Sequence, residues 1–189
     1  PTENLNAFAT GNKPKNGVVA CTEGILKLLD YKELEGVLAH EISHIKNRDI
    51  LITTIAATIG GIISYIAMIA RFRALSGARD RDSGNIFALL ALSILAPLAA
   101  LIIQLAISRT REYQADASGA NLIKNGEPLA IALEKLHSYN KGHPMRFGNP
   151  STSSLFIVNP FDTKSFFVTL FSTHPPYTKR TERLRAMKF

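Results

Sequence analysis

Two histidines four residues apart, with a glutamate beside the first, are the side chains best suited to metal chemistry in this chain. His40, Glu41 and His44 stand in the run His-Glu-Ile-Ser-His. Positions four apart share one face of an α-helix, so both imidazoles can bind one ion. The glutamate can then reach a water molecule on that ion and act as a general base. The motif therefore predicts a hydrolytic zinc site carried by a helix.

The residues around the motif predict the helix itself. Asp30 and Glu33 have the spacing of a capping box, which indicates a helix over residues 30–49. Apolar residues form a stripe along this helix, and Val37 shares the neighbouring face with the motif residues. We expect the stripe to be buried and the histidines to face a cleft; the alternative is a surface helix whose histidines have no common role. The stripe consists of Leu34, Leu38, Ile42 and Ile45.

A catalytic zinc ion needs a third protein ligand. A second helix, expected over residues 109–124, carries Glu112 and Asp116 on one face, and its alanines and glycine allow a close approach to the first helix. Glu112 is the candidate third ligand. Asp116, one turn later, can accept a hydrogen bond from the second ring nitrogen of a ligand histidine. The alternative is a solvated acidic pair beside Arg109 and Arg111.

Two long stretches without charge separate these two helices. They cover residues 50–70 and 83–108, which are 21 and 26 residues long. Either stretch can cross the roughly 30 Å hydrocarbon core of a bilayer as a helix, and Pro97 is tolerated in such a helix. The rest of the chain is too small to bury two such helices on all sides. We therefore predict a transmembrane hairpin and a lipid bilayer as a partner, in preference to a pair of core helices.

The net charge of +7 does not by itself indicate a nucleic acid partner. Basic residues are scattered or lie near the ends of the apolar stretches, no nucleic-acid-binding motif is present, and attraction to a membrane surface explains them better. The same explanation covers the basic residues of the last helix. The single cysteine, Cys21, excludes an internal disulfide and a cysteine zinc cage. Because the chain begins at Pro1, we expect it to be a fragment or a processed form.

The remaining sequence predicts a small sheet and further short helices. The connection of residues 71–82 and the segment of residues 141–154 are rich in polar residues, Gly or Pro and are expected to be loops, whereas residues 155–158 and 166–171 fit a strand or a helix equally well. Strands are expected over residues 4–10 and 17–22, and helices over residues 23–29, 127–139 and from near Pro176.

Together these motifs resemble the HtpX family of bacterial membrane-bound zinc peptidases, which are relatives of the CAAX prenyl proteases. The resemblance covers nearly the whole chain and keeps the order of the family's motifs. It implies an α+β, mainly helical fold, in which a zincin-like metallopeptidase domain (residues 1–49 and 109–189) contains an inserted transmembrane hairpin (residues 50–108). The motifs are His40–His44 with Asn47 and Asp49, Arg111–Asp116, Ser172-Thr-His174-Pro175 and Asn6–Gly11.

The resemblance also implies a role for each matching residue. His40, His44 and Glu112 correspond to the ligands of one zinc ion, Glu41 to the catalytic base, and Asp116 to the residue that supports a ligand. His174 corresponds to a residue that stabilises the transition state, although a structural role in its turn remains equally open. The implied activity is cleavage of misfolded or damaged membrane proteins under stress. The implied location is the bacterial inner membrane, with the catalytic domain on the cytoplasmic side.

Two other classes of protein remain open at this stage. Di-iron carboxylate proteins use paired Glu-x-x-His motifs, and Glu134 with His137 repeats that spacing. Against this class, a fourth glutamate on a fitting helix is not evident, and His40 would have no role. The second alternative is a catalytically silent membrane scaffold that has kept the motif. Metal analysis separates the first alternative from a zinc enzyme, and a cleavage assay separates the second.

Overall fold

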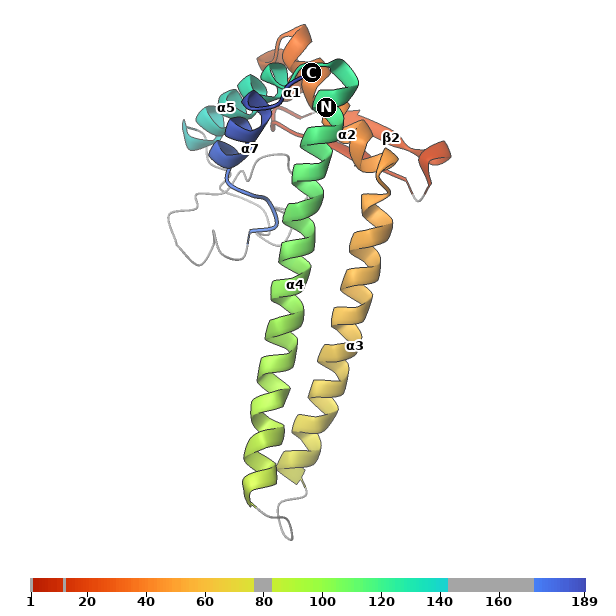
Figure 1. Cartoon of the computed structure of the whole chain (residues 1–189), viewed down its shortest axis with the longest axis vertical. Coiled ribbons are helices and arrows are strands. Elements are labelled where there is room, and N and C mark those ends of the chain that lie inside the picture. The colour runs from red at the N-terminus through yellow and green to blue at the C-terminus, as the bar shows by residue number, and fades with distance from the viewer. Residues whose placement is uncertain (1, 12, 77–82, 143–171) are drawn as a thin grey trace. The chain divides into compact units, whose positions relative to one another are not determined.

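The computed structural model describes residues 2–11, 13–76, 83–142 and 172–189, and it confirms the α+β, mainly helical fold (Figure 1). By contacts the chain separates into two compact units, one of Pro1–Ile50 with Ser108–Phe189 and one of Leu51–Ile107. The elements in chain order are β1 (Ala7–Thr10), the 3-10 turn η1 (Pro14–Asn16), β2 (Val18–Cys21), α1 (Glu23–Leu28), α2 (Tyr31–Lys46), α3 (Asp49–Ser76), α4 (Ser83–Ile123), α5 (Glu127–Gly142) and α7 (Tyr177–Arg185).

The helix that carries the motif begins as predicted. Asp30 accepts a hydrogen bond from the backbone N–H of Glu33, and the Glu33 carboxylate accepts one from the backbone N–H of Asp30. This confirms the capping box at the start of α2. The helix ends at Lys46, after which Arg48 takes a left-handed backbone conformation (φ 56°). That turn leads directly into α3 at Asp49.

The expectation for the apolar stripe of α2 is wrong. The buried face of α2 carries Val37, His40 and Glu41, whereas Ile42 is 45% exposed. Leu34, Leu38 and Ile42 line an open apolar depression of about 240 Å³, together with Leu122 near the end of α4. Of the four stripe residues, Leu34 also packs against the hydrophobic core. The face that carries the histidines is buried because it packs against α4, which supplies Glu112 and Asp116 as partners for the histidines.

Small residues set the close packing on both sides of α2. On one side, Gly36 lies against the backbone of Leu129 in α5, which belongs to the main hydrophobic core. On the other side, Gly119 of α4 lies against the backbone of Ala39 and His40. A methyl group at either glycine would approach backbone atoms to 2.7–2.9 Å, closer than van der Waals contact allows. The two glycines thus fix how near α5 and α4 come to the motif.

A two-stranded antiparallel sheet lies beside α2. β1 and β2 pair with Ala7 opposite Cys21 and Thr10 opposite Val18, which confirms two strands but shortens both predicted ranges. Gly11 has a φ of 125°, a conformation that favours glycine, and it begins the connection between the strands. Leu5 and Ala7 of this segment reach the hydrophobic core.

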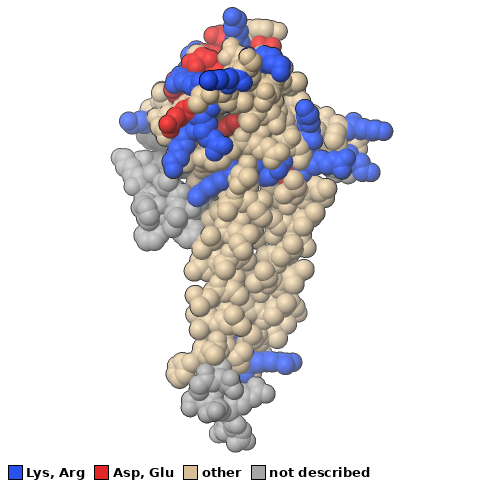
Figure 2. Space-filling model, viewed as in Figure 1, with Lys and Arg blue, Asp and Glu red and all other residues tan. Residues whose placement is uncertain are grey.

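The second unit consists of two long apolar helical segments. α3 and the segment Ile86–Ile123 of α4 are long and apolar enough to cross a membrane, with only 11% of the most apolar window of each buried. They run side by side within this unit, where the side-chain amide of Gln104 donates to the carbonyl of Ala56 (3.4 Å). On the face seen in Figure 2, these helices show few Lys, Arg, Asp or Glu side chains. They are not core helices of the described chain.

Several predicted boundaries differ from the structure. Residues 71–76 continue α3 as helix, and residues 83–123, predicted as an apolar stretch and a separate helix, form the single helix α4, with Pro97 inside it. Residues 141 and 142 end α5. The rest of the predicted loop, residues 143–154, and the two undecided segments, residues 155–158 and 166–171, lie outside the described residues.

Candidate metal centre

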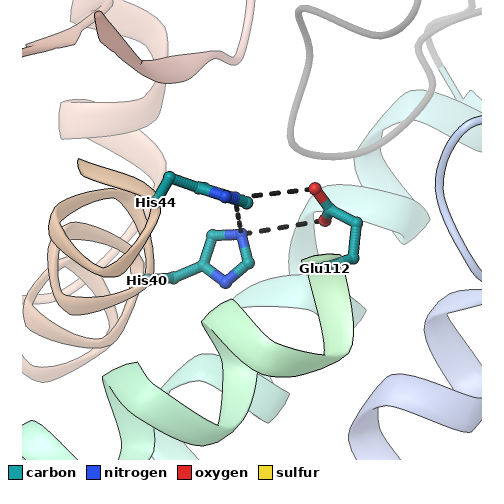
Figure 3. Close-up of side chains that lie close together, drawn as sticks. All are labelled: His40, His44 and Glu112. Atoms are coloured by element: carbon teal, nitrogen blue, oxygen red, sulfur yellow. Dashed lines mark hydrogen bonds and ion pairs between the residues drawn. The ribbon is translucent and has the colours of Figure 1, made fainter. Parts of the chain in front are cut away.

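Three side chains from two helices converge on one point. His40 and His44 project from α2 toward Glu112 of α4, as Figure 3 shows. The two Nε2 atoms are 3.0 Å apart, His44 Nε2 lies 3.5 Å from one oxygen of Glu112, and His40 Nε2 lies 3.8 Å from the other. Among the residues that the structure describes, His40, His44 and Glu112 form the group of His, Cys, Asp and Glu side chains whose ligand atoms are close enough to share one ion.

The spacing of these atoms fits a tetrahedral zinc ion. Bonds of about 2.0–2.2 Å at tetrahedral angles place ligand atoms roughly 3.3–3.5 Å apart. The observed separations of 3.0, 3.5 and 3.8 Å bracket this range. Two imidazoles and one carboxylate also leave one position for water, as catalytic zinc sites do. The donor set and its geometry therefore suit zinc.

The other ring nitrogen of each histidine faces a carboxylate. Nδ1 of His40 lies 3.0 Å from Asp116, as expected from the sequence, and Nδ1 of His44 lies 2.7 Å from Asp49. A carboxylate accepts but does not donate, so each Nδ1 carries the proton and each Nε2 lone pair points into the ligand group. Both carboxylates are buried, with exposed fractions of 4% and 5%. The sequence did not lead us to predict this role for Asp49, although Asp49 stands only five residues after His44.

The candidate base, Glu41, lies on the buried face of α2 beside the ligands. Burial raises the pKa of its carboxyl group, and the nearby His40 and His44 partly offset this. A raised pKa moves a carboxylate toward the range where it exchanges protons near neutral pH. Burial would lower the pKa of His44, but the hydrogen bond to Asp49 and the surrounding carboxylates outweigh it and raise that pKa.

Two further cationic or polar groups contact Glu112. His174 Nδ1 lies 3.0 Å from Glu112, and its turn is held by Arg109, which donates to the carbonyl of Ser172 (3.1 Å). Arg180 lies 3.2 Å from Glu112 and forms a two-pronged pair with Asp116 (2.7 and 2.8 Å).

Arg180 corrects one prediction about the last helix. The residue is 1% exposed, and although burial would lower its pKa, the neighbouring carboxylates outweigh this and raise the pKa, so it stays charged. Arg183 lies over the ring of Tyr113, and Arg185 pairs with Glu127 and Glu134. Attraction to a membrane surface is thus the wrong explanation for the buried Arg180, and it stays a prediction for the exposed Arg183 and Arg185. Their partners lie far away in sequence, so only the fold reveals them.

The second Glu-x-x-His motif lies elsewhere. Glu134 is half-buried and paired with Arg185, and the ring of His137 stacks on Tyr177 with centroids 4.0 Å apart. The geometry gives no support to a two-metal site built from both motifs.

Comparison with known proteins finds relatives over nearly the whole chain. The sequence matches peptidase family M48 over residues 1–188. It is 56% identical to a protease HtpX homolog of Pyrococcus furiosus and 53% identical to one of Desulforapulum autotrophicum, covering 98% of this chain in each case. The chain spans 64% and 60% of the length of these two relatives. The crystal structure of S. mikatae Ste24p shares the fold, with a TM-score of 0.57 and 24% identity over 96% of this chain and 42% of that one.

Proposed function

The chain belongs to peptidase family M48, and from that premise we propose that it is a membrane-bound zinc endopeptidase that cleaves misfolded or damaged membrane proteins. One observation carries the proposal: His40, His44 and Glu112 present three ligand atoms within 4.8 Å of one another, beside the buried carboxylate of Glu41. This arrangement combines a metal site with a base, which is what hydrolysis of a peptide bond by water requires.

The chain's own residues divide the chemistry between them. When bound by His40, His44 and Glu112, zinc supplies Lewis-acid polarisation of the scissile carbonyl and of the attacking water. Glu41 accepts the proton of that water at its carboxylate and delivers it to the leaving amine nitrogen. His174, at the edge of the ligand group, is our candidate donor to the oxyanion that develops on the carbonyl oxygen.

The small sheet offers a way to hold an extended substrate. Within the described residues β1 pairs with β2 along one edge, and Phe8 of β1 is 44% exposed. A peptide that adds a strand to the other edge of β1 would bind through backbone hydrogen bonds, which gives affinity with little demand on sequence. Such tolerance suits an enzyme that acts on damaged proteins of many sequences.

The two apolar helices support the proposed location. They contain the uncharged stretches of residues 50–70 and 83–108; His40 and His44 come before the first stretch, and Glu112 follows the second. We place the catalytic unit on the cytoplasmic side of the inner membrane, as the family resemblance implies. Misfolded membrane proteins are then available within the same bilayer.

The decisive experiment uses Glu41→Gln, which keeps the shape of the side chain and the three ligands but removes the proton acceptor. The full chain is purified in detergent, its metal content is measured, and digestion of an unstructured protein such as casein is followed. Glu41→Gln should retain one zinc ion per chain and lose nearly all hydrolysis. The matched control is Glu35→Gln, an exposed glutamate of the same helix, which should cleave like the wild type.

The outcomes separate the competing classes. Wild-type turnover by the Glu41→Gln variant would refute the proposed base. Two iron ions per chain would favour a di-iron protein, and a zinc-loaded wild type without cleavage of any tested protein would favour a silent scaffold. Purified protein that binds no zinc would overturn the proposed function as a whole.

A further inference from the structure

The turn between α2 and α3 brings a buried carboxylate back to the metal helix. Arg48, with its left-handed backbone, follows the end of α2, and Asp49 comes next as the first residue of α3. The Asp49 side chain is 7% exposed, and its Oδ2 accepts a hydrogen bond from Nδ1 of His44 at 2.7 Å. The second motif histidine is therefore held by a residue outside its own helix.

An arginine on α4 holds that carboxylate from the other side. Arg111 Nε donates to Oδ1 of Asp49 at 2.5 Å, and its Nη2 donates to the backbone carbonyl of Asn47 at 3.2 Å. Its Nη1 donates to the side chain of Gln114 at 2.5 Å. The guanidinium thus contacts both the carboxylate and the turn that presents it. Arg111 is also the immediate neighbour of the third ligand candidate, Glu112.

The two oxygens of the Asp49 carboxylate contact different partners, and this limits which side chains can replace it. Oδ2 of Asp49 serves His44, and Oδ1 serves Arg111. Because both neighbours donate, a group with two acceptor atoms is needed at this position, and an amide, with one acceptor and one donor, cannot satisfy both. The negative charge also keeps the His44 proton on Nδ1 and leaves Nε2 available to a metal.

From these contacts we propose that Asp49 and Arg111 are positioning residues for the metal site: Arg111 fixes Asp49, and Asp49 fixes the ring orientation and tautomer of His44. The inference rests on the proposed zinc site. It adds a connection that runs from the helix of Glu112, through the half-buried Arg111 and the buried Asp49, to the ligand His44 on the other helix. The distance between two ligands is thereby set by charge-assisted hydrogen bonds as well as by helix packing.

The test measures zinc affinity directly, by competition with a chromophoric chelator, on the full chain in detergent. Asp49→Asn should weaken zinc binding by about 10–100-fold, the usual effect of losing a group that supports a ligand histidine. Arg111→Met should weaken it less, by about tenfold, because Asp49 can still accept from His44. Thermal unfolding of each variant, recorded without zinc, shows that the compared proteins are folded.

The double variant supplies a readout that a purely structural role would not move. In Asp49→Asn with Arg111→Met, the single amide oxygen no longer has to serve the arginine and can accept from His44. Zinc should then bind more tightly than to Asp49→Asn alone, so the two changes are not additive. The matched control is Glu33→Gln, which alters another buried carboxylate and should leave zinc affinity unchanged. Glu33 pairs with Lys135 at 2.6 Å and does not contact the ligands.

Two results would overturn the proposal. If Asp49→Asn binds zinc as tightly as Glu33→Gln does, the carboxylate does not position His44. If the double variant is as weak as the sum of its single changes or weaker, Arg111 does not act through Asp49. A wild type that binds no zinc would refute the proposed function itself, which distinguishes that failure from a failure of the positioning pair.

Discussion

Replacing Gly119 by alanine tests whether the contact between α4 and α2 sets the geometry of the metal site. The new methyl carbon would lie 2.9 Å from the backbone nitrogen of His40, about 0.5 Å short of the 3.4 Å at which ordinary contact begins. Backbone atoms cannot rotate away, so the two helices must separate. Glu112 stands on α4 and both histidines on α2, so the separation moves one ligand away from the other two.

The expected magnitudes follow from that displacement. Metal–ligand distances in proteins hold within about 0.2 Å, so a shift of about 0.5 Å should weaken zinc binding tenfold or more, which is about 1.4 kcal/mol. Overpacking costs about 1–3 kcal/mol in folding stability, and the better helix propensity of alanine returns about 1 kcal/mol. We therefore expect a net loss of about 0–2 kcal/mol in unfolding free energy, together with the loss of at least tenfold in zinc affinity.

Gly36→Ala is the matched control for this experiment. Its methyl carbon would lie 2.7 Å from the backbone nitrogen of Leu129, so it crowds α2 equally, but against α5 on the side away from Glu112. Zinc affinity is measured by chelator competition, and stability by thermal unfolding without metal. Gly36→Ala should lose stability and keep its zinc affinity. Zinc binding by Gly119→Ala at the wild-type affinity, or an equal weakening in both variants, would refute the reasoning.

The remaining predictions concern charge, backbone and topology. Arg180→Met leaves two buried carboxylates without their cation and should lower stability by about 3–5 kcal/mol, and added zinc should restore part of it in thermal unfolding. Arg48→Gly relieves a left-handed backbone (φ 56°) and should raise unfolding free energy by up to about 1 kcal/mol, with zinc affinity unchanged. A cysteine at Ser76, after Cys21→Ser, should react with an impermeant thiol reagent outside intact cells whose outer membrane is permeabilised; labelling only after lysis would refute the proposed topology.

Local sequence patterns predicted the parts of this fold that depend on local interactions. The capping box at Asp30 and Glu33 needs only four residues, and the structure confirms it. The two uncharged stretches likewise predicted two long apolar helices, which the structure contains. The spacing of His40 and His44 follows from helix geometry alone.

Other features depend on contacts between distant segments, and the sequence could not reveal them. The stripe through Ile42 was expected inside because it is apolar, but the histidine face is buried because α4 supplies Asp116 and Glu112 as partners. In the sequence, Arg180 looks like its basic neighbours. Its partner Asp116 stands 64 residues earlier in the chain, and only the fold brings the two together. No local pattern encodes such a pairing.

Because the chain is synthesised from its N-terminus, the positions of the ligands in the sequence determine when the metal centre can assemble. His40 and His44 leave the ribosome before residues 51–107, and Glu112, His174 and Arg180 leave it afterwards. In a chain that spans a bilayer, the metal centre can assemble only when both apolar helices have inserted and returned the later residues to the compartment of the first. A nascent or wrongly inserted chain lacks a complete centre. The proposed peptidase would therefore become active only after correct membrane insertion.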